Sequence, residues 1–549
     1  MEDRQQLLAD PLRHRWAIRE RVYAKALDPQ EATAIAYALV HADPGAFWRE
    51  ICHLLWEQVP PGEAADTFGT IQYLLQTEHP TFVPYLLRVQ ARQLLEAGPD
   101  LRYSLLRRVD LGHQELTPVH LEQLAHHRCF RAIEELSLRH TGLPPEAFDV
   151  LFGASFWHLR RLDLSYNGLG LEQHRALVGS PCFGQLTHLD LTCTGLRGAG
   201  VGVLASSASE RLCVLTLEHN RPGWGGVAAL SRADWPALRR LELGDAWLGV
   251  DQGLKALISG PLLSSVSALG LSHNDLRAAD LEPFIRHPGL ARLEALALQR
   301  NPLADEGARL LASGPYLEAL QRLDLSHCGI GDDGAASLGG SVTLAPTSLI
   351  LQGNAIGEAG GQALAASGLL SRTGHLDLSD NAVGPETIVA LACSPHTHAL
   401  RRLSLRGSQG GDAGVSALIS SERLGQLQEL RLDASGLTRV GLRCLAQSPQ
   451  LASIQHLGIG GNPLTDEAVI ELVRSPHARN LRLLGLSDLP ISDAVGHAIA
   501  HAPHLERLEQ LELMHTGIGP DAANAMVHAP HTTAILGDTL RATYLLTGG

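Results

Sequence analysis

The stretch Leu159–Leu169 reads LRRLDLSYNGL. Its fixed residues follow the spacing L-x-x-L-x-L-x-x-N-x-L, and the same frame recurs about every 27 residues from Leu106 almost to the C-terminus. In the L-x-L segment the two leucines point to one side and the residue between them to the other, which is typical of a short, half-buried strand. Sixteen copies predict sixteen parallel strands stacked side by side. Their middle residues are Val109, Leu136, Leu162, Leu189, Leu215, Leu241, Leu269, Leu296, Leu323, Leu349, Leu376, Leu403, Leu430, Leu457, Leu484 and Leu511.

The second half of each copy predicts a helix. Segments such as GDDGAASL (Gly331–Leu338) and TDEAVIEL (Thr465–Leu472) carry an acid where the free N–H groups of a helix N-terminus need an acceptor. Small-residue–proline pairs such as Ser394-Pro395 and Ser448-Pro449 mark the expected helix ends, because proline cannot continue a helix. The fold class is therefore an α/β solenoid of strand–helix units with a parallel sheet on its concave side.

The segment Leu320–Leu338 carries the phrase L-x-x-L-x-L-x-x-N-x-I-x-D-x-G-x-x-x-L nearly whole, with Cys328 in place of the asparagine. This phrase resembles the ribonuclease-inhibitor-like type of leucine-rich repeat, a class that includes the repeats of NOD-like receptors and of the GTPase-activating protein of Ran. The resemblance implies a horseshoe-shaped solenoid that displays binding surfaces.

The flanks of the repeats do not follow the frame. Residues 1–104 predict an all-α N-terminal domain, with helices opening at Asp28-Pro29 and Asp43-Pro44 and another over Tyr85–Leu95. This domain would either cap the solenoid or recruit an effector. Residues 105–519 form the repeats and residues 520–549 a C-terminal cap, because Asp538 would be buried unpaired in a further repeat.

Composition narrows the functional classes. The formal net charge of −14 argues against a nucleic-acid partner and mildly favours a basic one. No apolar run approaches the roughly 20 residues of a membrane span, and the charged N-terminus lacks a secretory signal, so we expect a soluble, cytoplasmic protein. Two lysines against 42 arginines indicate a GC-rich bacterial genome. The eight scattered cysteines predict reduced thiols.

No catalytic or cofactor motif is present. The sequence lacks the Walker A, G-x-S-x-G, H-E-x-x-H and C-x-x-C patterns, so we expect no enzyme activity and no cofactor. His113 and His140 share one position in adjacent repeats, as His273 and His327 do two repeats apart. Two stacked imidazoles fall short of the three or four ligands of a zinc site, which predicts surface histidines and no metal.

Two surface patches occupy positions that the frame leaves free. The first, the acidic–aromatic patch, combines carboxylates of the expected strand face with rings that are expected in loops after the strands. Aromatic residues inside a charged rim are typical of protein-binding hot spots, although the tryptophans would otherwise only fill loops. Its residues are Asp163, Tyr166, Asp190, Glu218, Trp224, Glu242, Asp245 and Trp247.

The second patch is basic and consists of Arg402, Arg406 and Arg431 on adjacent strands. Paired guanidiniums would suit a carboxylate or phosphate. Internal pairing is favoured, because the acids Asp377, Asp380, Glu429 and Asp433 are close in the repeat frame.

These features predict a non-enzymatic protein–protein interaction scaffold or recognition module that binds a protein partner, with a basic segment, on the concave face. One alternative is a GTPase-activating or other catalytic regulator resembling the GTPase-activating protein of Ran. The other is a sensor subunit that gates a separate effector.

Overall fold

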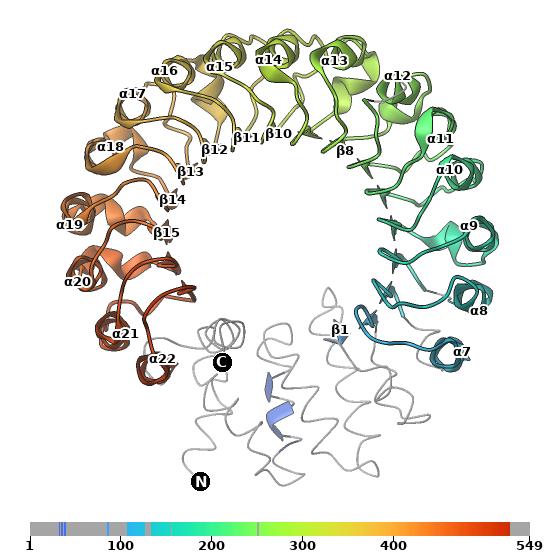
Figure 1. The fold of residues 1–549 in the computed structure, drawn as a ribbon, viewed down its shortest axis with the longest axis horizontal. Coiled ribbons are helices and arrows are strands. Elements are labelled where there is room, and N and C mark those ends of the chain that lie inside the picture. The colour runs from blue at the N-terminus through green and yellow to red at the C-terminus, as the bar shows by residue number, and fades with distance from the viewer. Residues whose placement is uncertain are drawn as a thin grey trace. The chain divides into compact units, whose positions relative to one another are not determined.

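The computed structural model describes residues 107–527 except 127–132, 155, 157, 250 and 251, together with residues 32, 34–36, 38, 39, 85 and 86. The chain divides into two compact units. Unit 1 comprises Met1–Trp247 and Ala256–Val266, and unit 2 comprises Leu248–Lys255 and Ser267–Gly549. In each unit the strands line the inner side and the helices cover the outer side (Figure 1).

Unit 1 contains the strands β1 (Tyr85–Leu86), β2 (Arg108–Asp110), β3 (Glu135–Ser137), β4 (Arg161–Asp163), β5 (His188–Asp190), β6 (Val214–Thr216) and β7 (Arg240–Glu242). Its helices are α7 (Pro118–His126), α8 (Ala147–Gly153), α9 (Leu171–Gly179), η4 (Phe183–Gln185), α10 (Gly198–Ala205), α11 (Gly223–Leu230) and η5 (Leu262–Ser264), and the division between the units falls within α12 (Gly253–Leu257). The strands pair in parallel, each with the next along the chain.

Unit 2 contains the strands β8 (Ala268–Gly270), β9 (Ala295–Ala297), β10 (Arg322–Asp324), β11 (Ser348–Ile350), β12 (His375–Asp377), β13 (Arg402–Ser404), β14 (Glu429–Arg431), β15 (His456–Gly458), β16 (Leu483–Gly485) and β17 (Gln510–Glu512). Its α-helices are α13 (Ala278–Ile285), α14 (Ala304–Ala312), α15 (Asp332–Gly339), α16 (Glu358–Ala365), α17 (Pro385–Cys393), α18 (Gly411–Ser420), α19 (Arg439–Gln447), α20 (Asp466–Val473), α21 (Asp493–Ala500) and α22 (Pro520–Val527). Short turns of 3-10 helix follow several of them: η6 (Pro288–Arg292), η7 (Gly368–Arg372), η8 (Glu422–Leu424), η9 (Pro449–Ser453) and η10 (Pro476–Asn480).

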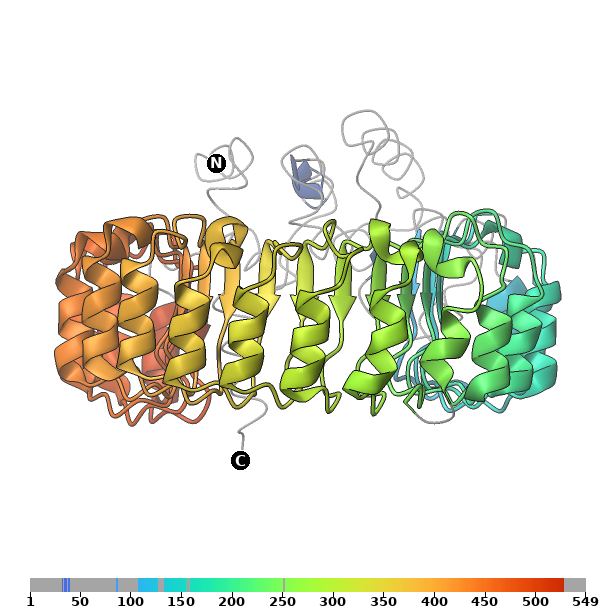
Figure 2. The same ribbon diagram turned by 90° about the horizontal axis from the view of Figure 1, so that it is seen from above.

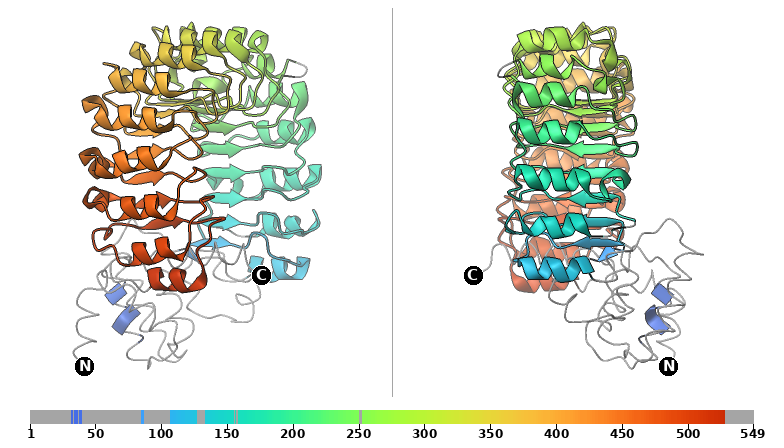
Figure 3. Two further views of the ribbon diagram at one scale, coloured as in Figure 1. Left: turned by 60° about the vertical axis from the view of Figure 1, so that its left-hand side comes forward. Right: turned by 90° about the vertical axis from the view of Figure 1, so that its right-hand side faces the viewer.

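All sixteen strands predicted from the repeat frame are confirmed, each centred on the expected residue. The strands of unit 2 also pair in parallel with their neighbours along the chain. Their middle leucines align, as Leu296 does with Leu323, and these leucines are buried. Strands stack directly on one another and helices lie side by side within each unit (Figures 2 and 3).

The turn after each strand is built in one way. In all sixteen repeats the residue four positions past the middle one has a left-handed backbone, with φ between 50° and 66°. The next residue then points inward and is often asparagine. Asn301, for example, donates to the carbonyl oxygens of Leu271 (2.9 Å) and Leu298 (2.8 Å) and accepts from the backbone N–H groups of Asn274 and Leu276. One buried amide therefore satisfies polar backbone groups of two repeats.

The acids at the helix N-termini act differently from the expectation. In α14, α15, α18 and α20 they cap the helix of the following repeat instead of their own, whereas Asp280 of α13 accepts from the N–H of Arg277 at the start of its own helix. Oδ1 of Asp305 in α14 accepts from the N–H groups of Gly331 (2.6 Å) and Gly334 (3.0 Å) at the start of α15. Asp332 in α15 accepts from Gly357 (2.7 Å) and Gly360 (2.9 Å) at the start of α16. The reason is steric: glycine lets the next helix approach so closely that the neighbouring carboxylate is the nearest acceptor.

The predicted flanks are described only in part. Residues 32, 34–36, 38 and 39 are helical, within the run that opens at Asp28-Pro29, and Ala32, Ala36 and Leu39 are buried. Tyr85–Leu86 forms a strand that pairs with β2, not the start of a helix. At the C-terminus, α22 occupies the first part of the predicted cap 520–549, and residues 528–549, including Asp538, lie outside the described residues.

Candidate functional site

Two carboxylates of the acidic–aromatic patch lie directly opposite each other on neighbouring strands. Asp163 of β4 is in register with Asp190 of β5. Asp163 accepts hydrogen bonds from Ser137 Oγ (3.1 Å) and Ser165 N (2.9 Å), and Asp190 accepts one from Thr192 N (2.8 Å). Burial raises the pKa of Asp190, and the Asp163 carboxylate adds to the shift. Like charges directly opposite each other on a sheet are destabilising.

A second pair of acids lies on the next strands of unit 1. Glu242 is on β7, and Glu218 follows β6 by two residues, on the same face as β6 residue Thr216. Burial raises the pKa of Glu242; the Glu218 carboxylate adds to this shift, whereas Arg240 opposes it with its Nε 3.8 Å from Oε1 of Glu242. Burial of the Glu242 carboxylate therefore outweighs the opposing effect of Arg240 on its pKa.

The rings of the patch lie at the edge of this face, beyond the strands. Tyr166 and Trp247 both follow the strands in left-handed turns and are 38% and 48% exposed. An arginine lies against each ring: the guanidinium carbon of Arg139 is 4.6 Å from the centroid of Tyr166, and that of Arg221 is 4.0 Å from the centroid of Trp247. Such stacking holds a ring in place while leaving part of it accessible.

Trp224 differs from the expectation of a loop residue. It lies in the first turn of α11 and is 57% exposed. Pro222 precedes the helix, and α11 begins at the left-handed Gly223, one residue before the tryptophan. The ring of Trp224 therefore belongs to the N-terminal end of a helix and not to a loop. Asp245 also has a partner that the sequence analysis missed, because His219 Nδ1 lies 2.9 Å from its Oδ2.

The structure thus divides the acidic–aromatic patch into neighbouring clusters within unit 1, and the arginines and histidine among them were missed from sequence. A repeat-by-repeat alignment would have found them. Arg221 and Trp247 hold the same position in consecutive repeats, as do His219 and Asp245, so each pair is brought together by stacking.

The three arginines of the basic patch differ in their contacts. The guanidinium of Arg431 lies among three carboxylates, with nitrogen–oxygen distances of 3.7 Å to Glu429, 3.9 Å to Asp433 and 3.5 Å to Glu512. Arg402 and Arg406 are exposed, and neither forms an ion pair with any residue that the structure describes. Arg406 and Arg431 both line the groove described next, and Arg402 is not among its lining residues.

A polar groove of about 510 Å³ lies on the strand face of unit 2 around Arg431. It contains five carboxylates and two guanidiniums. Its lining residues are Gln352, His375, Asp377, Ser379, Ser404, Arg406, Glu429, Arg431, Asp433, Ala434, Gly460, Gly461, Ser487, Asp488 and Glu512. Burial raises the pKa of Asp433 and lowers that of His375, so the imidazole is neutral at pH 7. The sequence signal for this groove is glycine at the outward position of consecutive strands, at Gly458 and Gly485.

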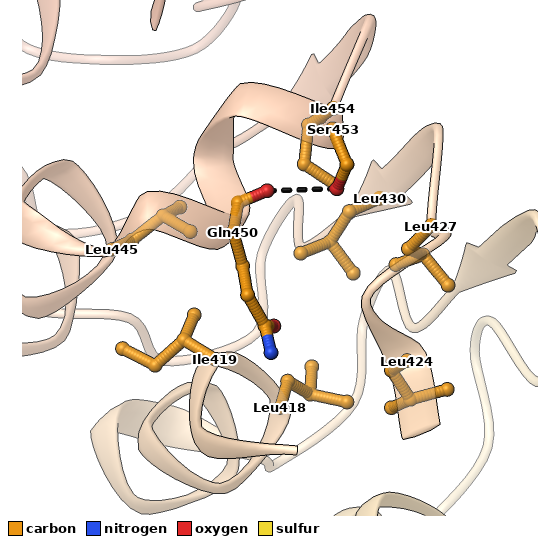
Figure 4. Close-up of a pocket in the computed structure, with 9 residues that line it drawn as sticks. All are labelled: Leu418, Ile419, Leu424, Leu427, Leu430, Leu445, Gln450, Ser453 and Ile454. Atoms are coloured by element: carbon orange, nitrogen blue, oxygen red, sulfur yellow. Dashed lines mark hydrogen bonds between the residues drawn. The ribbon is translucent and has the colours of Figure 1, made fainter. Parts of the chain in front are cut away.

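A second, apolar cavity in unit 2 is too small for a ligand (Figure 4). It has a volume of about 20 Å³ and is enclosed by leucine and isoleucine side chains with Gln450 and Ser453. The Gln450 amide donates to the carbonyl of Ser421 (2.6 Å), and Ser453 Oγ donates to the carbonyl of Gln450 (2.8 Å). This space holds at most about one water molecule.

The rings of His113 and His140 are tilted by 45° to each other with their centroids 5.4 Å apart, and the described residues contain no group of three or more potential metal ligands. Among those same residues, no helix combines the length and apolar character needed to cross a bilayer.

The repeats are similar in sequence and structure to those of known proteins. The Leucine Rich repeat family model matches residues 158–172, 292–312, 319–339 and 347–365. The human CD180 antigen is 30% identical over 122 residues, which is 22% of this chain and 17% of CD180. The TLR13–ssRNA13 complex has 19% identity and a TM-score of 0.48, over 76% of this chain and 54% of TLR13. A chain of the yeast Rad7–Elc1 complex has 17% identity and a TM-score of 0.40, over 60% of this chain and 76% of the matched chain.

The repeat frame and the sixteen strands define a leucine-rich-repeat solenoid fold, and segments of it match the family model. Proteins of this class serve as protein-interaction or recognition modules. The chain matches less than a fifth of the length of CD180 and about half that of TLR13.

Proposed function

We propose that this chain is a non-enzymatic recognition module that binds a protein partner through the strand face of unit 1, at the acidic–aromatic patch. The observation that carries the proposal is the in-register pair Asp163 and Asp190, whose charges repel each other and which the repeat frame does not require. A cationic side chain between them would relieve this repulsion. The exposed rings at the edge of the face supply apolar area that a partner would bury.

The partner fitted by this chemistry carries a basic, extended segment. Solenoids offer long concave surfaces to such segments, since each repeat adds one row of side chains. The net charge of −14 weighs against a nucleic acid, whose phosphates need clustered arginine and lysine. An electrostatic contact of this kind weakens as salt screens it.

Binding of partners captured from native lysate tests this proposal. The double variant Asp163→Asn/Asp190→Asn should reduce capture at low salt by tenfold or more, and Trp247→Ala should reduce it several-fold. Matched controls are Asp324→Asn, at the same repeat position in unit 2, and Tyr316→Ala, a ring of similar exposure outside the patch. If the controls and the patch variants lower capture equally, the patch is not the binding site.

The same preparation distinguishes the catalytic alternative. If a GTPase is captured and its turnover accelerates when the chain is added, the chain is a regulator and not a passive module. No side chain in the described residues is singled out by geometry for that role, so the recognition module is the favoured function.

We also propose a repeat type, a cellular origin and domain bounds for this chain. We assign the repeats to the ribonuclease-inhibitor-like type, because successive middle residues are 26 to 28 positions apart and nearly every repeat adds an outer α-helix. A cytoplasmic, bacterial origin fits the six described cysteines, all of which are free thiols. The domains proposed are 1–104 as a helical head, 105–519 as repeats and 520–549 as a cap.

A further inference from the structure

Four consecutive strands of unit 2 form a trough in the groove around Arg431. The outward positions of β14, β15, β16 and β17 hold Arg431, Gly458, Gly485 and Glu512, which are aligned in register. The two glycines have no side chains, so the space above them is open. The side chain of Arg431 extends across this space, and its Nη1 lies 3.5 Å from Oε2 of Glu512, three strands away.

The glycines are needed for this arrangement. A Cβ at Gly458 would lie 2.7 Å from Cδ of Arg431, and a Cβ at Gly485 would lie 3.1 Å from Oε2 of Glu512. Any larger residue at Gly458 would therefore displace the arginine stem from the trough. The trough is shaped for an extended guanidinium-bearing side chain.

The carboxylates around Arg431 are incompletely compensated by positive charge. The guanidinium nitrogens are 3.5 to 3.9 Å from Glu429, Asp433 and Glu512, whereas charge-assisted bonds between guanidinium and carboxylate are about 2.7–2.9 Å long. Arg406 also lines the groove and His456 Nδ1 lies 3.8 Å from Glu429, but five carboxylates still face only two guanidiniums, and the groove of about 510 Å³ leaves room beside Arg431. These carboxylates thus have unused capacity to accept from a second cation.

We infer that this groove is a second recognition site, which binds an arginine side chain of a partner peptide, and that Arg431 occupies the partner's position in the free protein. The incoming guanidinium bonds to Glu512 and Asp433 and displaces that of Arg431. Arginine fits better than lysine because its planar fork can donate to two carboxylates at once. This site lies in unit 2 and is independent of the proposed function of unit 1.

Fluorescence anisotropy with a labelled tetra-arginine peptide and the full chain tests the inference. The background is Asp163→Asn/Asp190→Asn, which removes the acid pair of unit 1. Glu512→Gln should weaken binding by fivefold or more. Arg431→Met, which keeps an unbranched stem over Gly458, should strengthen binding several-fold, because no internal guanidinium competes. A tetra-lysine peptide should bind more weakly than tetra-arginine.

Asp324→Asn, at the same repeat position in β10 but outside the groove, is the matched control and should leave the affinity unchanged. Circular dichroism and the melting temperature report whether each variant folds. If Arg431→Met leaves binding unchanged or weakens it, the arginine does not occupy a partner's position and the inference is wrong. Equal binding by the Glu512→Gln variant and its parent would also overturn it. Neither outcome affects the proposal for unit 1, whose acids are already removed in this background.

Discussion

Unit 1 and unit 2 repeat the same strand frame but differ in how the starts of their outer helices are satisfied. In unit 2 acids on the outer helices cap the next helix, as Asp305, Asp332, Asp412 and Asp466 do. In unit 1 the residues before α9, α10 and α11 are Gly170, Arg197 and Pro222, and none of them forms a side-chain cap bond. Both units also carry acids on the strand face: Asp163 and Asp190 of unit 1 face each other, whereas Glu429, Asp433 and Glu512 of unit 2 surround Arg431.

The difference teaches which acids are structural. A carboxylate that caps a helix is fixed by backbone N–H groups, and its removal lowers stability. Asp163 and Asp190 each accept one backbone N–H, in the turn after their own strand, and they also face each other across the sheet. This unfavourable contact between like charges supports the binding role proposed for them. Large buried rings such as Trp235 and Phe148 hold unit 1 together, with the Trp235 indole donating to the carbonyl of Ser207 (2.9 Å).

The largest effect is expected from a methyl group placed in the helix contacts of unit 2. Gly360→Ala puts a Cβ 2.6 Å from Oδ1 of Asp332 and 2.8 Å from its Cα, and should destabilise the fold by about 2 kcal/mol. Gly202→Ala is the matched change in α10 of unit 1, where a Cβ has no heavy atom within 4 Å. It should stabilise the fold by about 0.5 kcal/mol through helix propensity. Urea denaturation measures both changes in unfolding free energy. Equal effects would contradict the prediction that the helices of unit 2 are packed more closely at this glycine than α10 of unit 1 is at Gly202.

Removing one capping acid should have the next largest effect. Asp332→Ala leaves the N–H groups of Gly357 and Gly360 without their acceptor and should cost about 1 kcal/mol. Asp333→Ala changes the adjacent, exposed acid of the same helix and should change the unfolding free energy by less than about 0.5 kcal/mol. A similar loss in both variants would show that net charge, not capping, is responsible.

The acid pair of unit 1 should respond with the opposite sign. Asp163→Asn/Asp190→Asn removes a like-charge contact and should raise the unfolding free energy by about 0.5 kcal/mol at pH 7. Because burial raises the pKa of Asp190, the folded chain binds protons more tightly, so wild-type stability falls as pH rises through the window from 3.8 upward. The variant should lack this slope. A destabilised variant would place these acids among the structural ones.

The smallest effect concerns His174 in α9 of unit 1. Its Nδ1 lies 2.7 Å from the carbonyl of Gly170, its Nε2 is buried without a hydrogen-bond partner in the described structure, and burial lowers its pKa. The unfolded chain therefore gains a proton first as pH falls below 6.5, and stability declines. In melts between pH 7 and pH 5 the variant His174→Leu should lose this part of the decline, whereas His501→Gln, at an exposed position, should keep it. Identical pH profiles for His174→Leu and wild type would contradict the assignment.

The strands could be predicted to the residue because the L-x-L spacing directly reports which side chains are buried. The helix caps could not, since an acid such as Asp332 stands at the start of its own helix in sequence and only stacking shows that the next helix is nearer. The candidate patch of Asp163, Asp190 and the rings was proposed from composition and repeat position, and its role in binding stays a prediction. The stacking of arginines on those rings and the groove at Gly458 and Gly485 could not be predicted. Both arise from contacts between repeats, and the sequence of a single repeat does not show them.

The helix-to-helix capping in unit 2 also bears on how such a chain changes length in evolution. Asp305 meets Gly331 and Gly334 as Asp332 meets Gly357 and Gly360. Excision of residues 331–356 would bring Asp305 against Gly357 and Gly360, with donor and acceptor still matched. Whole repeats can therefore be lost or duplicated by recombination without creating an incompatible junction, so the number of rows on the strand face can vary while its architecture is inherited.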